Sequence, residues 1–481
     1  MPPSPPNGNA SAASSQPLRF IPKQDIARAR STRLARLGQA MQRHRKLILG
    51  IQWVVVVFYF LLLIIPAFMP VPAQNAHVYD NLRLFAQFLF WGIWWPFVML
   101  SMMLVGRVWC GVFCPEGALT EWISWRGLGL PIPRWIRWTG WPFTAFVATT
   151  IYGQLVSVYE YPQAALLVLG GSTVAALIVG FLYGRGKRVW CKYLCPANGV
   201  FALLTKIAPI HFAVDQTAWK NHVGERSHAV ECAPLIDIAH MKSASACHSC
   251  GRCADHRGGA VQLAARAPSH EILSLQNKDV TTEQAITLSF GMLGIATAAF
   301  LWSSSSWLIE LKMQIANWLI DHDMMFLLQD NAPWWILTHH PEANDVFTWL
   351  DGLCVLGFIV GGGVLLGGLV WAGIRLATSV VGDHNLSWQR LSLALIPMAG
   401  ISIFLGLSML TLTHLNAEGW TPLWINQARA ALMVLGGGFS AWLALRLIFS
   451  QFSLRRLAGF ILFLAPLCLS LAVWYQAFFM K

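Results

Sequence analysis

Charged residues are scarce in this chain of 481 residues: Asp, Glu, Lys and Arg make up only 12% of it, whereas 56% is hydrophobic. About a quarter of the residues in a soluble domain are charged, so this composition excludes a soluble globular protein. Acidic residues are the rarer kind, and the net charge is +12. The excess Lys and Arg cluster beside apolar runs, where they set membrane orientation. We therefore predict a membrane protein with no nucleic-acid partner.

Several functional signatures are also missing. The sequence contains no glycine-rich nucleotide loop, no pattern typical of a catalytic triad and no flavin site. Few ionisable residues lie deep in the apolar runs, where they would mark an ion or proton path, and this argues against a primary transporter. We expect no cleaved signal peptide, because the first apolar run starts late, near Leu47, is too long, and is not followed by a small-residue cleavage site.

Nine apolar runs are long enough to cross a bilayer, which takes about 20 helical residues. They are 47–68, 84–106, 141–158, 164–183, 285–308, 346–380, 391–414, 430–449 and 457–478. The predicted fold class is an all-α polytopic membrane protein of about nine transmembrane helices with a small cytoplasmic ferredoxin-like insertion. Lys and Arg gather on one side of the runs, which the positive-inside rule makes cytoplasmic. The N-terminus is then inside, the C-terminus outside, and a bacterial inner membrane the expected location.

The polar segments divide the chain into four parts. Residues 1–46 are a cytoplasmic N-terminus: 1–22 lack the apolar residues needed to fold, and the basic remainder favours an amphipathic helix on the inner leaflet. The other three parts are a four-helix membrane domain at 47–196, a cytoplasmic ferredoxin-type segment at 197–283, and a five-helix membrane domain at 284–481 with an outer loop at 311–346.

One stretch, Arg-Val-Trp-Cys-x3-Cys-Pro, occurs twice, at 107–115 and 188–196. Each copy ends a hydrophobic hairpin on the basic side, and the identical flanks indicate internal duplication. At this spacing the two thiols of each copy are expected to share one helix face. The four thiols are Cys110, Cys114, Cys191 and Cys195. They would stay reduced in the cytoplasm, and together they suffice for one metal site or cluster.

Two other interpretations of the repeated motif stay open. Free cysteines are often buried as small apolar residues, so the four thiols could simply pack at helix ends. They could also form a redox-active thiol pair, because a nearby Arg107 or Arg188 would lower a thiol pKa.

A third group, Cys247-x2-Cys250-x2-Cys253, lies in the polar segment. Two-residue gaps let three thiolates converge on three corners of a cubane 4Fe-4S cluster. A complete bacterial ferredoxin run has a fourth Cys where this chain has Arg257. Candidates for the fourth ligand, in order, are Cys232, a Cys of the repeated motif, and His256 or His248. A structural zinc knuckle is the alternative, although zinc sites more often pair two Cys-x2-Cys units.

This arrangement of cysteines resembles the membrane-bound polyferredoxins. That family includes the quinol-dehydrogenase subunit of periplasmic nitrate reductase, the nitrous-oxide-reductase regulator and the cytochrome-oxidase assembly accessory protein. The resemblance covers about residues 45–270. It implies electron transfer across or beside a membrane, from a quinol pool or a cytoplasmic donor.

The chain departs from the family in two ways. The family usually has two complete ferredoxin runs after its spans, whereas this chain has one incomplete run. Residues 284–481 have no counterpart in the short members of the family. One 4Fe-4S cluster on the Cys247 group is therefore expected, and a second, on the repeated motif, is left open.

Three histidines are candidate metal ligands on the outer side, namely His322, His339 and His340. Met324 and Met325 accompany them, and imidazole with thioether suits copper. Outer-loop histidines are also commonly just solvated, so both interpretations are kept.

The predicted function is an inner-membrane iron–sulfur electron-transfer protein with a quinol or redox-protein partner. Whether it is an oxidoreductase or an electron-carrier subunit is left open. One rival is a copper-reducing assembly factor for a respiratory enzyme, which would need the outer histidines. The other is a non-redox zinc-binding scaffold or sensor, which would be colourless.

Overall fold

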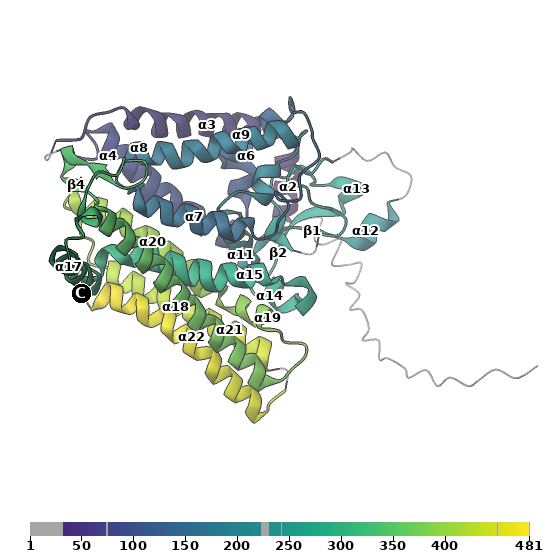
Figure 1. Ribbon diagram of the computed structural model, residues 1–481. Helices are drawn as coiled ribbons and strands as arrows, with labels where there is room; N and C mark the ends of the chain where they lie inside the picture. The colour runs from purple at the N-terminus through teal and green to yellow at the C-terminus, as the bar shows by residue number, and fades with distance from the viewer. Residues whose placement is uncertain (1–31, 74–75, 223–229, 242, 450, 481) are drawn as a thin grey trace, which may run out of the picture.

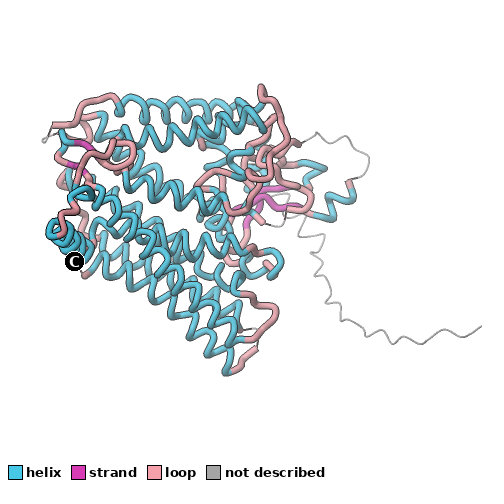
Figure 2. Tube along the Cα trace, viewed as in Figure 1, coloured by secondary structure: helices cyan, strands magenta, loops and turns pink. Residues whose placement is uncertain are grey.

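The computed structural model describes residues 32–73, 76–222, 230–241, 243–449 and 451–480. The disorder predicted for residues 1–22 lies outside these ranges. Across the described residues the chain is mainly helical, with loops gathered at its ends and two small two-stranded sheets (Figure 2). The predicted all-α fold class is confirmed.

The described part of the chain has eight helices that are long and apolar enough to cross a membrane. Their bounds are Arg45–Ala67 (α3), Leu82–Val105 (α4 to α5), Pro162–Tyr183 (α8 to α9), Thr282–Ser304 (α15 to α16), Trp349–Val381 (α18), Trp388–Ala417 (α19 to α20), Ile425–Ile448 (α21) and Leu454–Phe479 (α22). They match eight of the nine predicted runs to within a few residues. The ninth is α7 (Trp141–Leu155), whose 15 residues span about 22 Å, less than the roughly 30 Å hydrocarbon core.

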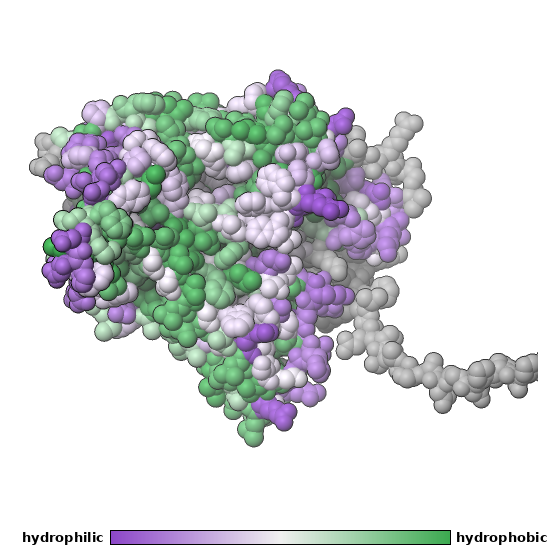
Figure 3. Space-filling model, in the orientation of Figure 1, coloured by the Kyte–Doolittle hydropathy of each residue, from purple (hydrophilic) through white to green (hydrophobic). Residues whose placement is uncertain are grey.

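The outer surface of the helices is apolar. On α3 alone, Val54, Val57 and Leu61 are at least half exposed. Figure 3 shows hydrophobic side chains over the middle of the molecule and hydrophilic ones gathered at its two ends. An uncovered apolar band of this size is stable in lipid rather than in water.

The two ends of the bundle differ in structure (Figure 1). One end, here called the thiol end, carries an antiparallel sheet in which β1 (Ile210–Val214) pairs with β2 (Val261–Ala265), with Phe212 opposite Leu263. The same end carries the short helices α11 (Asn198–Leu204), α12 (Gln216–Asn221), α13 (His256–Gly259) and α14 (His270–Ser274). The other end, here called the opposite end, carries α17 (Ser306–Asp321), β3 (His339–His340) and β4 (Asp345–Val346).

The most buried helices lie in the middle of the bundle. In Thr282–Ser304 and in Trp388–Ala417, 72% of an 18-residue apolar stretch is buried inside the protein, whereas the share in α3 is 28%. Their side chains form the main core, which includes the fully buried Leu288, Met292 and Ile396. This core packs the C-terminal helices against α5 and α11 and so fixes the thiol end.

The helix α2 (Arg33–Arg43) packs on the sheet of the thiol end. Thr32 caps it, accepting a hydrogen bond from the Ala35 N–H at 3.1 Å. A Cβ atom at Gly38 would lie 3.1 Å from Leu263 Cβ of β2, and one at Gly251 would meet Met41 of α2. The basic helix expected on the inner leaflet therefore also covers the segment of Cys250 and Cys253.

Candidate metal centre

The first motif turns back into the bundle as soon as its helix ends. Gly106, at φ +71°, reverses the chain, and a short π-helical turn (Trp109–Phe113) follows. Cys114 then caps a new helix, α6 (Pro115–Ser124), whose first residue is a proline, as a helix start favours. The Gly117 N–H donates to Cys114 Sγ at 3.4 Å. This thiol thus lies at a helix N-terminus, where the helix dipole favours a thiolate.

The second motif also places one thiol in a short helical turn and the other just after it. The short helix α10 (Val189–Tyr193) holds Cys191, and Cys195 lies in the turn between α10 and α11. Neither motif is one continuous helix, so the prediction that each thiol pair shares a helix face is wrong. The reason is the Cys-Pro step: a proline disfavours helical backbone at the residue before it.

The four motif thiols gather into one group, here called the first tetrad: Cys110, Cys114, Cys191 and Cys195. Cys114 lies within electrostatic range of the other three thiols. Cys110 and Cys191 are buried, whereas Cys114 and Cys195 are partly exposed. Two motifs that are far apart in sequence therefore form one site.

The remaining motif thiols form the second tetrad: Cys232, Cys247, Cys250 and Cys253. Cys253 lies within electrostatic range of the other three thiols. Burial raises the pKa of the Cys247 thiol to about 12, although the Ser249 N–H donates to its Sγ at 3.4 Å. Such a thiol becomes a thiolate when a metal displaces its proton. The structure thus places Cys232 beside the Cys247 group.

Arg257, which occupies the position of the fourth ferredoxin cysteine, is not part of this group of thiols. Its guanidinium lies over the Trp219 ring, 4.6 Å from the centroid. The His256 ring also packs on Trp219, at 5.4 Å. Cys232 lies within electrostatic range of Cys247 and Cys253, and its role as the fourth ligand stays a prediction.

The first tetrad lies below the end of the bundle rather than at its surface. Glu116, two residues after Cys114, interacts with Ser172 and Thr173 of α9. Thr173 lies ten residues before the end of α9 at Tyr183, or about 15 Å along the helix axis. The Trp109 ring lies 5.2 Å from the Trp94 ring, at a similar depth on the preceding span. The repeated motifs therefore re-enter the membrane region.

The two tetrads are adjacent. A Cβ atom at Gly111 would lie 2.1 Å from the His248 carbonyl oxygen and 2.9 Å from Cys250 Cα, so only glycine allows this backbone approach. Gln52, a polar residue buried in α3, donates to the Gly111 carbonyl at 2.8 Å. The first motif is thereby held against the loop of the second tetrad.

The two arginines of the repeated motif are buried between the tetrads. Arg107 is 3% exposed and donates to the Ser245 carbonyl at 2.7 Å and to Asn198 Oδ1 at 2.8 Å. Arg188 is 1% exposed and donates to the Cys110 carbonyl at 2.6 Å. Each arginine thus links its own motif to another part of the site.

A buried carboxylate, Glu121 of α6, ties the motifs together further. Arg188 Nε donates to Glu121 Oε2 at 2.8 Å, and Arg252 pairs with the other carboxylate oxygen. Although burial raises the pKa of Glu121, the two guanidinium groups hold it below its ordinary value. This charged network joins both motifs to the loop of the second tetrad.

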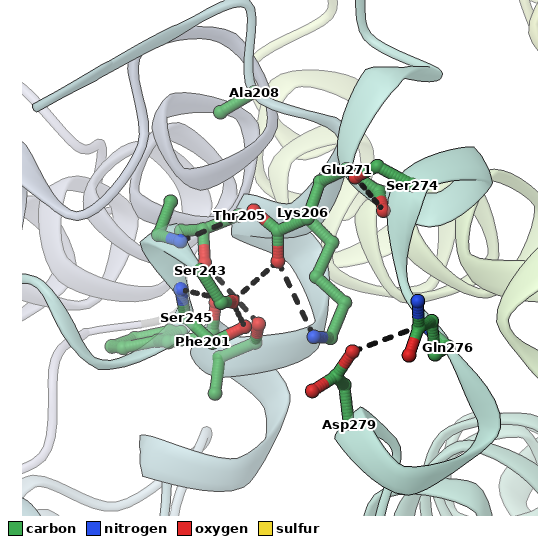
Figure 4. Close-up of polar contacts among 12 residues, drawn as sticks. Phe201, Thr205, Lys206, Ala208, Ser243, Ser245, Glu271, Ser274, Gln276 and Asp279 are labelled. Carbon is green, nitrogen blue, oxygen red and sulfur yellow. Dashed lines mark hydrogen bonds and ion pairs between the residues drawn. The ribbon is translucent and has the colours of Figure 1, made fainter. Parts of the chain in front are cut away.

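A second charged network holds the chain before Cys247 (Figure 4). Glu271 of α14 accepts hydrogen bonds from the Ser243 hydroxyl and from the Ala244 N–H, the latter at 3.1 Å. It also pairs with Lys206, at 3.3 Å, and with Arg266. Burial raises the pKa of Glu271, but the two cations hold it below its ordinary value. The carboxylate therefore fixes residues 243–244 while it is charged.

A cavity of about 760 Å³ opens beside the first tetrad. Cys114, Cys195 and Glu116 lie on its wall, as do Tyr152 and Tyr159 near the opposite end of α7. Most of the other lining side chains are aromatic or aliphatic, and the spans Leu82–Val105 and Pro162–Tyr183 and the helix α7 supply many of them. They include Trp91, Trp94, Trp95, Phe146, Leu167 and Val168. The cavity can accept a mainly apolar molecule of drug-like size next to two thiols.

Each tetrad supplies four thiols, the number of thiolates that a cubane cluster takes. A cubane binds them at the corners of a body of iron and sulfide. A zinc ion can also take four thiolates, with Zn–S bonds of about 2.3 Å. Within the described ranges, no three His, Cys, Asp or Glu side chains form a group that could hold a single metal ion. The donor set is therefore that of a four-thiolate centre.

Within the described residues, the three outer histidines form no group that could hold a metal ion. The His322 ring stacks on Trp318, with centroids 4.2 Å apart, and its Nδ1 lies 2.8 Å from the Trp318 carbonyl. His340 is buried and stacks on Tyr161, with centroids 3.6 Å apart. His339 is its neighbour in β3. Their proposed role as copper ligands stays a prediction.

Sequence reasoning missed the buried charges around the tetrads. Glu116 and Glu121 follow the first Cys-Pro step in a stretch that is otherwise nearly free of charge. An acidic residue beside an apolar span is costly unless it is paired, so its position alone indicates a partner. Lys206 and Glu271 are far apart in sequence, and nothing in the sequence pairs them.

Comparisons with known proteins identify the kind of domain. Residues 87–135 and 166–213 match the family described as a 4Fe-4S binding domain, and each match contains one copy of the motif. The chain is 28% identical over 178 residues to the ferredoxin-type protein NapH of Haemophilus influenzae, and the aligned region covers 33% of this chain and 62% of NapH. It is 30% identical over 135 residues to the regulatory protein NosR of Pseudomonas aeruginosa, and this aligned region covers 24% of this chain and 19% of NosR.

These matches confirm the resemblance to ferredoxin-type membrane proteins and support an iron–sulfur role in membrane electron transfer. The chain spans less than two thirds of the length of the curated relatives it matches. No solved structure matches it. The Cys247 group lies outside the two matched segments, so its assignment depends on the cysteine spacing and the site geometry.

Proposed function

We propose that this protein is a membrane electron carrier that binds one 4Fe-4S cluster in each tetrad. It exchanges electrons between a quinol in the cavity and a redox partner at the thiol end. The observation that carries this proposal is the cavity of about 760 Å³ that reaches Cys114 and Cys195 at membrane depth. A redox site beside an apolar cavity suits a lipid-soluble electron donor or acceptor.

The cavity has the properties of a quinol site. Its volume lies in the usual range for small-molecule pockets, about 300–1,000 Å³. Its aromatic walls suit a quinone ring, and the few polar groups, among them Glu116 and Tyr159, could orient the ring oxygens. Oxidation of a quinol to a quinone releases two electrons and two protons, and each cluster can accept one electron. Because Gly111 lies against Cys250, electrons would pass from the cluster of the first tetrad to that of the second.

The orientation is part of the proposal. Among the described basic residues, only Arg83, Lys312 and Arg429 belong to the opposite end, and the others lie toward the thiol end. By the positive-inside rule the thiol end faces the cytoplasm of a bacterial inner membrane. The partner that docks there is therefore a cytoplasmic redox protein or subunit.

Iron and acid-labile sulfide per chain test the two clusters. We expect about eight iron atoms per chain after anaerobic purification, and about four in the Cys110→Ser, Cys191→Ser double variant. The control is Cys354→Ser with Cys468→Ser, because these two cysteines belong to neither tetrad and should leave the iron content unchanged. A colourless protein with stoichiometric zinc would contradict the proposal.

A space-filling substitution tests the cavity. Gly171 lines the cavity, and a Cβ atom there meets nothing within 4 Å. We expect Gly171→Phe to slow cluster reduction by a short-chain quinol at least about tenfold, because the ring occupies the space that the quinol needs. Dithionite should still reduce the clusters fully.

The matched control for Gly171→Phe is Gly357→Phe on α18. Gly357 also has open space around its Cβ position but does not line the cavity. It should react with the quinol at the wild-type rate. Equal quinol rates in the two variants would contradict a quinol site in this cavity.

A further inference from the structure

Three nitrogen atoms buried near the tetrads have no hydrogen-bond partner among the residues that the structure describes. They are Arg107 Nε, Arg188 Nη2 and His248 Nδ1. The three residues are 3%, 1% and 3% exposed, so bulk solvent does not reach these groups. Buried polar atoms are normally paired, and an unpaired one at a candidate site points to a group that binds there.

The charge of Arg107 is also uncompensated. Its two neutral partners are the Ser245 carbonyl and Asn198 Oδ1. Within the described residues it forms no ion pair, whereas Arg188 and Arg252 share the single charge of Glu121. A buried cation without a counter-charge is strongly unfavourable, so this part of the protein is built to receive negative charge.

Each motif arginine lies close to both tetrads. Arg107 is three residues before Cys110 of the first tetrad, and it donates to the carbonyl of Ser245, two residues before Cys247 of the second. Arg188 is three residues before Cys191, and it donates to the carbonyl of Cys110, whose neighbour Gly111 packs against Cys250. The two arginines occupy the same position in the two copies of the motif, so the duplication places two cations at the contact between the tetrads.

We infer that Arg107 and Arg188 donate N–H···S hydrogen bonds to the sulfurs held by the two tetrads and raise the reduction potentials of both clusters. The inference rests on the proposed function, in that it requires a cluster in each tetrad. Reduction adds a negative charge, which a nearby cation and a donor to sulfur stabilise more than the oxidised state. Because the arginines are shared, one substitution changes both potentials.

Redox titration followed by EPR tests this inference on the purified, cluster-loaded protein. We expect Arg107→Gln and Arg188→Gln each to lower the midpoint potentials of both clusters. Arg107→Lys keeps the charge but loses the forked arrangement of N–H donors, so it should lower the midpoint potentials less than Arg107→Gln does. Arg185→Gln, an exposed arginine three residues from Arg188, is the control and should leave both potentials unchanged.

The outcomes separate this inference from the proposed function. If the wild-type protein lacks iron, the proposed function fails. If the variants keep wild-type iron but neither potential moves, or only one does, the inference fails while the clusters stand. The inference also has a test that needs no substitution. Pulsed EPR of wild-type protein labelled with ¹⁵N-arginine should show arginine nitrogen coupled to both reduced clusters. Absence of that coupling would overturn the inference.

Discussion

At the scale of single residues, Glu271 decides whether the second tetrad can assemble. It is 2% exposed and holds Ser243 and Ala244, just before Cys247, while Lys206 and Arg266 balance its charge. Removing one partner of a buried ion pair costs about 3–5 kcal/mol, because the other charges stay buried. We expect Glu271→Gln to lose the second cluster and keep the first, so that iron falls from about eight to about four atoms per chain.

The control for Glu271 is Glu283→Gln, because the Glu283 carboxylate accepts a hydrogen bond from the exposed Thr139 and contacts none of the residues just before Cys247, so the iron content should stay unchanged. The pH dependence has a definite sign. Because the pKa of Glu271 is lowered on folding, its stabilisation is full above the ordinary value of 4.5 and is lost as the pH falls through the lowered pKa. Wild-type protein should therefore keep its second cluster from pH 8 down to about 5. Equal iron in Glu271→Gln and wild type would contradict this role.

At the scale of elements, α2 acts as a cover over the second tetrad. Gly38 packs against Leu263 of β2, and Met41 packs against Gly251 between two of the thiols. We expect Gly38→Val to lift α2 off the sheet, because its side chain has no room there. The second cluster should then bleach in air faster than in wild type, while the first keeps its wild-type lifetime.

The matched control for the cover is Arg36→Val, which places the same β-branched residue on the exposed face of α2. It lowers the helix propensity, which Gly38→Val does not, and it does not touch β2. EPR signals recorded during exposure to air follow each cluster separately. The second cluster of Arg36→Val should bleach at the wild-type rate, and equal bleaching rates in the two variants would contradict a protective role for the contact between α2 and β2.

The elements also show where sequence reasoning succeeds and where it stops. Hydrophobic length alone placed α3, α5 and α9, because the bilayer fixes how many apolar residues a helix needs. It misjudged the motif helices, because Pro115 starts a new helix and Pro196 lies in the turn before α11, so that each motif is divided. The depth of the first tetrad depends on contacts such as that of Trp109 with Trp94, which no spacing in the chain encodes.

At the scale of the whole molecule, the grouping of thiols could be predicted only in part. The repeat indicates that Cys110 and Cys191 belong together, and the spacing indicates the same for Cys247, Cys250 and Cys253. Cys232 was one candidate among several, because the segment before it has no motif that fixes its place. The contact between the tetrads at Gly111 is a tertiary contact, and no spacing in the chain indicates that it brings two separate motifs together.

The topology of the whole chain gives a last prediction. The described C-terminal residues, at the end of α22, lie at the opposite end from the tetrads (Figure 1). If the thiol end is cytoplasmic, as the distribution of Lys and Arg indicates, alkaline phosphatase fused after α22 should be active and green fluorescent protein there should be dark. A fusion in the loop at Gly382, between α18 and α19 at the thiol end, should behave in the opposite way. The same phenotype at both sites would mean that α20, α21 and α22 do not cross the membrane three times, and would contradict the arrangement that places both tetrads on the cytoplasmic side.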